Sequence, residues 1–213
     1  MHEIKKITIG TDNCYIVSNG RDAILVDTAS APGCDKIIAE CSKFNMKLIV
    51  LTHVHFDHAE NAAKIADYFN IPVAVSKEDV ELFESFDKQP LFSYGLTGRI
   101  VLGLSLTVLR NTKVEKPHNI IFIKDGDSLA SYGIDAKIIS LPGHTNGSIG
   151  VDVEEKSLLV GDELDNWVVP ATGHLYTNLD AIKESAEKIR SLGERTLYYG
   201  HGKPTKNKFK FFK

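Results

Sequence analysis

The densest group of metal-binding residue types in this chain lies between residues 53 and 58. Four of these six positions carry an imidazole or a carboxylate, in the order His53, His55, Asp57 and His58. Imidazole and carboxylate are ligands that zinc, iron and manganese take in proteins. Because residues two apart in an extended segment point the same way, His53 and His55 can present their rings to one point. Asp57 and His58 follow as the chain turns, and they offer a carboxylate and a third imidazole to a neighbouring point.

The residues before this group predict where it lies in the fold. An apolar run, 48–51, directly precedes it, and a run of that length bounded by polar residues indicates a buried strand. Open α/β sheets place their sites at the carboxyl ends of strands, and the group leaves the strand from that end. The alternative is a chance cluster of surface histidines at a helix start, with Asp57 as its cap. We disfavour that alternative because spacing this tight rarely serves packing alone.

Three further residues of ligand type stand near the ends of strand-like runs in the second half of the chain. His144 lies in a turn rich in glycine, proline and asparagine, and Asp162 and His201 each follow a short apolar run. Each position alone is a weak signal, since a histidine between two glycines is more often a turn residue. Four such strand ends are stronger evidence, because a parallel or mixed sheet brings them to one edge.

Taken together, these segments resemble the metallo-β-lactamase-fold hydrolase superfamily. The family's motifs appear in order, as Thr-His-x-His-x-Asp-His at 52–58, Pro-Gly-His-Thr-x-Gly-Ser at 142–148, Gly-Asp at 161–162 and Gly-His-Gly at 200–202. The resemblance covers nearly the whole chain. It implies an α/β fold, a four-layer αββα sandwich in which two mixed β-sheets pack face to face and helices flank them.

The resemblance also implies two divalent metal ions, with zinc as the expected metal and iron or manganese as alternatives. One ion would be held by three imidazoles, those of His53, His55 and His144. The second would be held by Asp57, His58 and His201, with Asp162 bridging the two ions. Such a pair lowers the pKa of a bridging water, so that hydroxide forms at neutral pH, and it polarises a carbonyl or phosphoryl oxygen.

Two aspartates are expected to act beyond ligation alone. Asp57 would bind metal and accept a hydrogen bond from the nucleophile, which makes it the expected catalytic residue. Asp27, at the end of a strand-like run, is a candidate for a group that holds a ligating histidine in the right tautomer. A plain turn residue at the strand end is the alternative for Asp27.

The substrate is expected to be a small molecule, and its class stays open. The motif segments look most like the glyoxalase II branch, which hydrolyses glutathione thioesters and grips glutathione with a Lys-x-Tyr pair. Here the matching residues are His174 and Tyr176, and the branch's C-terminal helical domain is missing. We therefore expect another thioester, an ester or lactone, or a phosphodiester, with His174 and Tyr176 as contacts. Trp167 either lines an apolar pocket wall or packs in the core.

The residue at position 55 bears on the type of reaction. Members devoted to di-iron redox chemistry usually carry glutamate there, so His55 favours hydrolysis. Persulfide dioxygenases keep the same motif with one iron, which makes a mononuclear-iron oxidoreductase the alternative function. A scaffold that has lost turnover is disfavoured because all seven ligand positions are retained.

Composition restricts the partners and the compartment. A chain of 213 residues with a net charge of −3 can form one α/β domain over residues 1–213, and the mild charge argues against nucleic acid as a partner. No apolar run approaches the roughly 20 residues of a membrane span, and no signal peptide is indicated. Three cysteines, an odd number, favour a reducing, cytoplasmic compartment. The basic tail 206–213 is expected to be a frayed end or a packing strand.

The hydrophobic pattern predicts the remaining elements. Strand-like runs occupy 4–9, 14–18, 23–27, 72–75, 119–123, 136–141, 149–153 and 157–160, and helices are expected at 34–45, 59–69, 77–86 and 178–192. Residues 87–117 are the least regular part, because Pro90 and three glycines interrupt a largely apolar sequence. That segment is either a lid or dimer surface rich in exposed hydrophobes, or a helix and loop packed on the core. A homodimer through 87–117 is accordingly one expectation.

Overall fold

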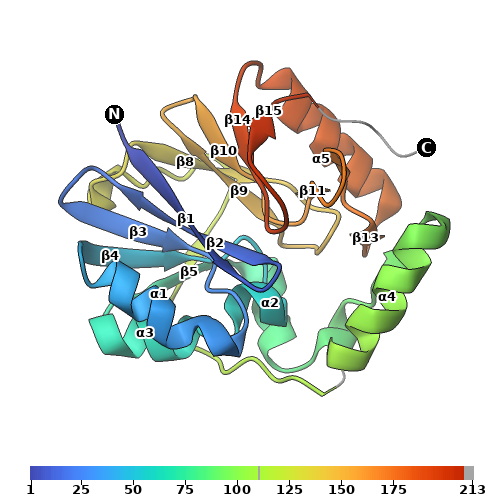
Figure 1. The fold of residues 1–213 in the computed structure, drawn as a ribbon, viewed down its shortest axis with the longest axis horizontal. Helices are drawn as coiled ribbons and strands as arrows, with labels where there is room; N and C mark the ends of the chain where they lie inside the picture. The colour runs from blue at the N-terminus through green and yellow to red at the C-terminus, as the bar shows by residue number, and fades with distance from the viewer. Residues whose placement is uncertain (110, 209–213) are drawn as a thin grey trace.

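Two β-sheets face each other in the computed structural model, which describes residues 1–109 and 111–208, and helices cover their outer faces (Figure 1). Within these ranges the first sheet has the order β1 (Glu3–Ile9), β2 (Asp12–Ser18), β3 (Asp22–Val26), β4 (Asn45–Val50), β5 (Val73–Ser76), β7 (Ile120–Ile123). The second has the order β15 (Thr205–Lys206), β14 (Thr196–Tyr198), β10 (Ser157–Leu159), β9 (Ile149–Val153), β8 (Ala136–Ser140). Both sheets are mixed, because β3, β4, β5 and β7 run parallel in the first and β10 runs parallel to β14 in the second. The predicted αββα sandwich is confirmed.

Alternating side chains of the strands separate three apolar layers. Leu25 of β3 packs toward α1 (Cys34–Cys41) and α3 (Ala62–Phe69), whereas its neighbour Ile24 packs toward the second sheet. On the far side of that sheet, Leu158 of β10 packs on α5 (Leu179–Ser191). This is the two-residue period of a strand that is buried on both faces. Because each fully buried Leu or Ile contributes about 1.5–3 kcal/mol, the middle layer holds the two sheets together and the outer layers hold the helices on them.

The strand that leads into the 53–58 group is β4. It runs parallel to β3, so the carboxyl ends of both strands meet at one edge of the first sheet. After β4 the chain bends at Thr52 and His53, is extended at His55, and then enters the short helix α2 (Phe56–Ala59). The predicted strand at 48–51 is therefore the end of β4, as the apolar run indicated.

The helical predictions are confirmed in part. Asn178 caps α5 as expected, because its side chain accepts hydrogen bonds from the amides of Asp180 and Ala181. The helix expected at 59–69 is divided into α2 and α3. Between them, the side-chain amide of Asn61 donates hydrogen bonds to the carbonyl oxygens of residues 28–30. The helix expected at 77–86 forms as the two 3₁₀ helices η2 (Lys77–Phe83) and η3 (Phe86–Lys88), and not as one continuous helix. Other short 3₁₀ turns are η1 (Ala31–Gly33) and η4 (Ala130–Tyr132).

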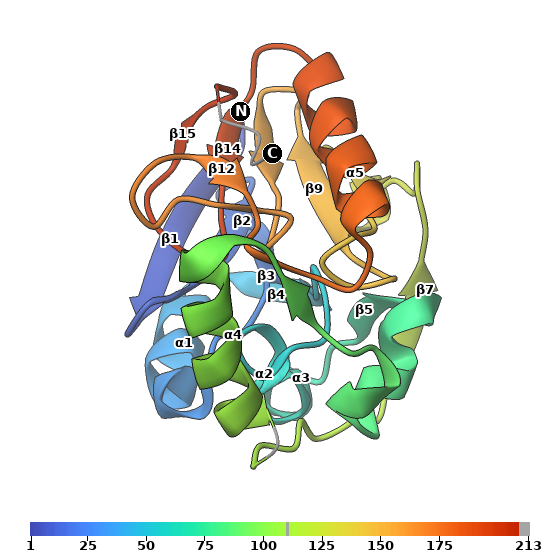
Figure 2. The same cartoon turned by 90° about the vertical axis from the view of Figure 1, so that its right-hand side faces the viewer.

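The segment 87–117 contains the helix α4 (Gly95–Leu109), which lies at the outside of the molecule, apart from both sheets (Figures 1 and 2). It follows β6 (Phe92–Ser93), which pairs with β13 (Leu175–Tyr176), while β11 (Leu164–Asp165) pairs with β12 (Ala171–Thr172). Leu96 and Ile100 of α4 are 77% and 60% exposed. The structure therefore favours the surface rich in exposed hydrophobes over a helix packed on the core.

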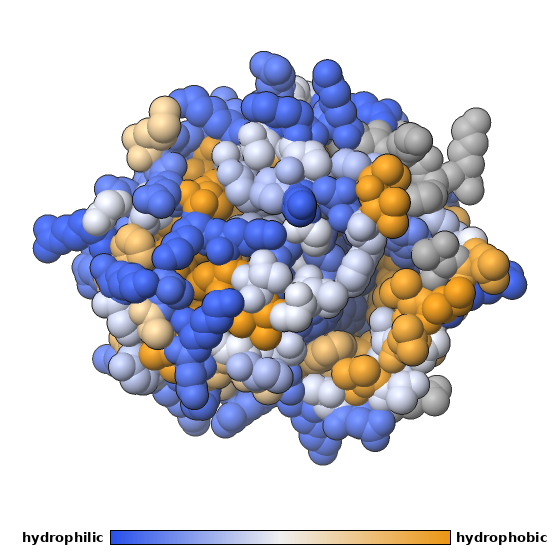
Figure 3. Space-filling view, viewed as in Figure 1, coloured by the Kyte–Doolittle hydropathy of each residue, from blue (hydrophilic) through white to orange (hydrophobic). Residues whose placement is uncertain are grey.

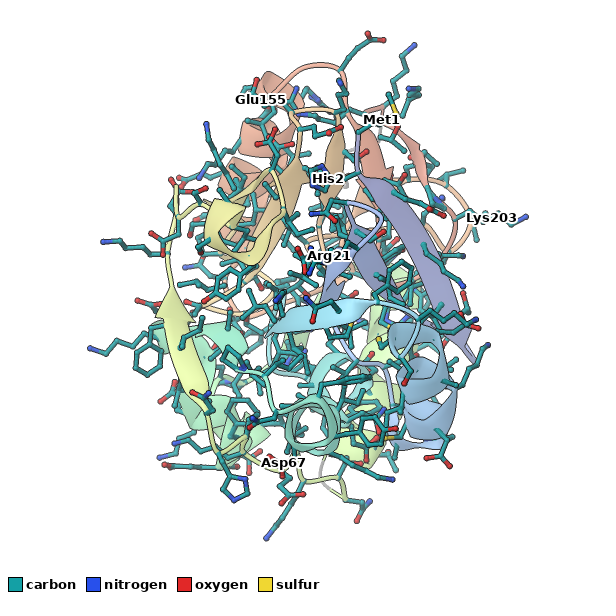
Figure 4. The ribbon with its side chains drawn as sticks, turned by 90° about the vertical axis from the view of Figure 1, so that its left-hand side faces the viewer. Met1, His2, Arg21, Asp67, Glu155 and Lys203 are labelled. Carbon is teal, nitrogen blue, oxygen red and sulfur yellow. The ribbon has the colours of Figure 1, made fainter. Side chains whose placement is uncertain are left out.

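The N-terminus lies on the side of the molecule opposite α4 (Figure 1), where Met1 and His2 lie near the turn at Glu155 (Figure 4). His2 Nδ1 lies 3.0 Å from Glu154 Oε1, in the turn between β9 and β10, and the His2 amide donates to the same oxygen. At the other end, Thr205 and Lys206 form β15, and the predicted tail from residue 209 onward lies outside the described residues. In the described ranges, no helix has the length and apolar character that crossing a bilayer requires.

Candidate metal centre

Seven side chains of ligand type converge where strands of both sheets end. Their nitrogen and oxygen atoms form two groups, each with its members within 4.8 Å of one another: His53, His55 and His144, and Asp57, His58, Asp162 and His201. Asp162 faces both groups, because its Oδ2 lies 3.3 Å from His201 Nε2 and 4.0 Å from His144 Nε2. The structure thus brings together the residues that the resemblance assigned to two ions.

In the first group, outer hydrogen bonds decide which ring nitrogen faces inward. His144 Nδ1 lies 2.9 Å from the carbonyl oxygen of Leu175, which can only accept, so His144 carries its proton on Nδ1. Its Nε2 then carries a lone pair, and this atom lies 3.0 Å from His55 Nδ1. That separation is close to the spacing between two ligands of one zinc ion, whose Zn–N bonds are about 2.0–2.1 Å.

The second group is oriented in the same way from two directions. Asp27 Oδ2 lies 2.8 Å from His58 Nδ1, and the carbonyl oxygen of Thr11 lies 3.1 Å from His201 Nδ1. The inner Nε2 atoms then face carboxylates, with His201 Nε2 3.2 Å from Asp57 Oδ2. Asp27, predicted from the sequence as an orienting group, also accepts from the backbone amide and hydroxyl of Thr52. It therefore links the ring of His58 to the segment that carries His53.

Several of the inward atoms are left without a hydrogen-bond partner among the described residues. They are His53 Nε2, His58 Nε2 and Asp162 Oδ1, all of them buried. An unsatisfied buried polar atom costs about 1–3 kcal/mol, and cations bound at the two ligand groups would satisfy these atoms. The residues present therefore fit divalent metal ions.

The charges around the two groups differ. Burial, reinforced by neighbouring imidazoles, lowers the pKa of His53 well below its usual value and that of His55 to about 3, so these rings are neutral lone-pair donors. Burial also acts on His58 and His201, but the carboxylate of Asp162 and its neighbours outweigh it and raise both pKa values well above the usual range. The second group therefore favours positive charge, which protons supply when no metal is bound.

Asp79 is a site residue that the sequence analysis missed. Its buried carboxylate accepts hydrogen bonds from Thr145 Oγ1 at 2.7 Å, the Gly147 amide at 2.8 Å and the Val54 amide at 3.3 Å. It thereby joins the loop that carries His53 and His55 to the loop that carries His144. In sequence Asp79 is one of two acidic residues at an expected helix start, which gave no signal of this role.

Gly200 is needed for the close approach of the second group. A Cβ atom at this position would collide with Asp162 Oδ1 and with the ring of His58. Its amide donates to the carbonyl oxygen of Gly161 at 2.9 Å, which sets the chain before His201 against the chain before Asp162. Any side chain here would force the two ligand segments apart.

A cavity of about 450 Å³ opens onto the ligands. Its lining includes five of them: His55, Asp57, His144, Asp162 and His201. Trp167 also lines it and stacks on His201, with ring centroids 4.7 Å apart. Since Trp167 is 49% exposed, the alternative that placed it in the core is wrong.

The two other predicted substrate contacts occupy different places. His174 lines the cavity and is hydrogen-bonded to Asp165. Tyr176 is not among the described residues of the cavity lining, and its ring stacks on Tyr94 with centroids 6.0 Å apart. A direct contact between Tyr176 and a substrate stays a prediction.

Comparison with known proteins identifies the family. The model of the metallo-beta-lactamase superfamily matches residues 7–201. The chain belongs to the metallo-beta-lactamase superfamily. It is 28% identical to a probable metallo-hydrolase of Methanocaldococcus jannaschii over 201 residues, which cover 90% of this chain and 88% of that protein. It is 29% identical to the hydroxyacylglutathione hydrolase GloC of Haemophilus influenzae over 167 residues, 76% of this chain and 71% of that one.

Solved structures agree on the superfamily's fold. TTHA1623 in a di-iron-bound form superposes with a TM-score of 0.68 at 22% identity. The match covers 96% of this chain and 94% of the TTHA1623 chain. The BLEG-1 B3 metallo-beta-lactamase superposes with a TM-score of 0.72 at 22% identity, with the same coverage of 96% and 94%. At these identities the likeness concerns the metallo-beta-lactamase fold alone.

Proposed function

We propose that this protein is a metal-dependent hydrolase that acts on a small thioester, ester or lactone. The observation that carries the proposal is the set of seven converging ligands, five of which line a cavity large enough for a small molecule. Two zinc ions are the proposed cofactors. When bound, divalent ions supply acidity to a water and an electrophilic partner for the substrate carbonyl.

Asp57 is the proposed catalytic residue. Its carboxylate lines the cavity, and Oδ2 lies 3.2 Å from His201 Nε2. From this position it can accept a hydrogen bond from an attacking water and hold that proton until the leaving group takes it. Trp167, stacked on His201, covers this part of the site and limits the access of other water molecules.

The relatives support the hydrolytic assignment. One is named a probable metallo-hydrolase, and another, GloC, is named a hydroxyacylglutathione hydrolase. A thioester therefore belongs among the first substrates to test. Among thioesters, a glutathione thioester is less favoured, since the lysine of the Lys-x-Tyr pair is replaced by His174, whose ring is hydrogen-bonded to Asp165.

The test combines elemental analysis with a panel of thioesters, lactones, β-lactams and phosphodiesters. We expect up to two zinc-type ions per chain, and the substitutions His55→Ala and Asp162→Ala should each lose metal and at least 100-fold in kcat/KM, the scale at which a metal contributes. Asp35→Asn is the control, because the Asp35 side chain is 97% exposed. Full activity in His55→Ala or Asp162→Ala would contradict the proposal. One iron per chain with oxygen uptake would instead identify the mononuclear-iron oxidoreductase.

A further inference from the structure

We propose that the acyl group of the substrate is an uncharged aliphatic chain that lies along α4, an inference that rests on the proposed function. The cavity extends from the ligands to this helix, where Val101, Leu104, Val108 and Leu109 line it. Leu91 and Trp167 add further apolar surface. A carbonyl placed at the ligands would therefore have apolar walls on the side that leads to α4.

The exposure of apolar side chains on α4 indicates that a ligand covers this surface when the protein functions. Leu104 is 68% exposed and Val108 is 42% exposed, although both line the cavity. Figure 3 shows hydrophobic residues gathered along this helix at the rim of a hollow. Contiguous apolar surface of this kind on a water-soluble fold marks a binding site. Because the surface is continuous with the cavity, the bound substrate is the occupant that fits it.

The side chains at the α4 end of the cavity favour an uncharged chain over an anionic one. None of the described residues that line the cavity is a lysine or an arginine, and Asp12 and Asp165 line it in addition to the ligating carboxylates. A carboxylate at the α4 end of the acyl group, away from the ligands and the metal ions they would hold, would meet apolar side chains and no lysine or arginine among the described residues of the lining. The uncharged aliphatic chain has no such conflict.

The first test measures how hydrolysis depends on chain length. The zinc-loaded enzyme is given acetyl, butanoyl, hexanoyl and octanoyl thioesters of one neutral thiol. We expect kcat/KM to rise by up to about fourfold per added methylene, the equivalent of about 0.8 kcal/mol. A terminal carboxylate on a chain of equal length should abolish this gain. Metal-dependent hydrolysis with no dependence on chain length would overturn the proposal and leave the proposed function intact.

The second test does not require turnover. Trp167 is the single tryptophan of the chain, and it lines the cavity. We therefore expect octanamide, a non-hydrolysable aliphatic amide, to shift Trp167 fluorescence saturably and at lower concentration than butanamide does. This readout stands even if none of the thioesters is hydrolysed, and a fluorescence that responds to neither amide would overturn the proposal.

Two double variants of α4 supply the matched comparison. Leu104→Ala with Val108→Ala removes cavity-lining side chains, and it should flatten the dependence on chain length in both tests. Leu96→Ala with Ile100→Ala removes apolar side chains of α4 that are exposed and do not line the described cavity, and it should leave both results unchanged. Equal effects of the two variants would overturn the proposal. So would a dimer that the Leu104→Ala and Val108→Ala variant dissociates, since α4 would then be an interface between copies.

Discussion

The ring of His58 shows how single contacts prepare this site for a cation. Asp27 Oδ2 lies 2.8 Å from His58 Nδ1 and is hydrogen-bonded to it. The other ring nitrogen, Nε2, lies 3.2 Å from Asp162 Oδ1 without a hydrogen bond between them. A histidine whose outer nitrogen donates to a carboxylate has a fixed orientation and a more basic inner nitrogen. The orientation of His58 is therefore determined by the protein before any metal binds.

Replacing Asp27 with asparagine tests this arrangement. Asp27 has a φ of 60°, a conformation that asparagine tolerates well, so Asp27→Asn keeps the backbone and the side-chain volume. It removes the charge beside His58, and we expect metal affinity to fall about 10- to 100-fold. Competition with a chromophoric chelator measures the affinity. Unchanged affinity would mean that Asp27 is only a strand-end turn residue, and exposed Asp35→Asn is the control.

At the scale of elements, α5 supports the loop that carries His144. The amide of Thr177, just before the helix, donates to the carbonyl oxygen of Gly143 at 2.8 Å. The helix begins at once, because Asn178 Oδ1 accepts from the amides of Asp180 and Ala181 at 3.0 and 3.1 Å. The capped first turn therefore fixes the position of the ligand loop as well as the helix.

Removing the cap should cost stability. We expect Asn178→Ala to lower the free energy of unfolding by about 1 kcal/mol, within the usual range of about 0.5–2 kcal/mol for a lost N-cap. Lys183→Ala, at an exposed position of the same helix, should change it by less than about 0.5 kcal/mol. Denaturant unfolding of both metal-free variants measures the difference. Equal values for the two would show that the Asn178 contacts contribute nothing.

The elements also show why some features were predictable from the sequence and others were not. The strand before His53 and the capped helix after Asn178 depend on local patterns, so the sequence was sufficient for both. Asp79 acts through partners near residues 54 and 145–147, and no local pattern records contacts between segments so distant in sequence. The helix expected at 77–86 forms as two 3₁₀ helices, because the capping and periodicity signals that predict a helix do not distinguish an α-helix from successive 3₁₀ turns.

At the scale of the whole molecule, the ligands come from both sheets. His53, His55, Asp57 and His58 follow β4 of the first sheet, while Asp162 and His201 follow β10 and β14 of the second (Figure 1). A metal ion held by both sets would therefore cross-link the sandwich at one edge. At the opposite edge, His2 and Glu154 already provide a contact between the sheets.

Metal removal should accordingly weaken the entire fold. A ligand that binds only the folded state stabilises it by about 2.7 kcal/mol when its free concentration is 100 times its Kd. We therefore expect chelation to lower the Tm by several degrees, since about 1 kcal/mol corresponds to about 2–4 °C at 150–250 residues. Added zinc should restore the Tm of the parent.

Asp162→Ala removes the carboxylate that faces both ligand groups, so zinc should raise its Tm less, whereas the exposed-site variant Asp35→Asn should respond like the parent. If the Tm of the parent were the same with chelator and with zinc, the ligands would not be joining the two sheets through a metal. A parent-like response of Asp162→Ala would place the stabilising ion elsewhere.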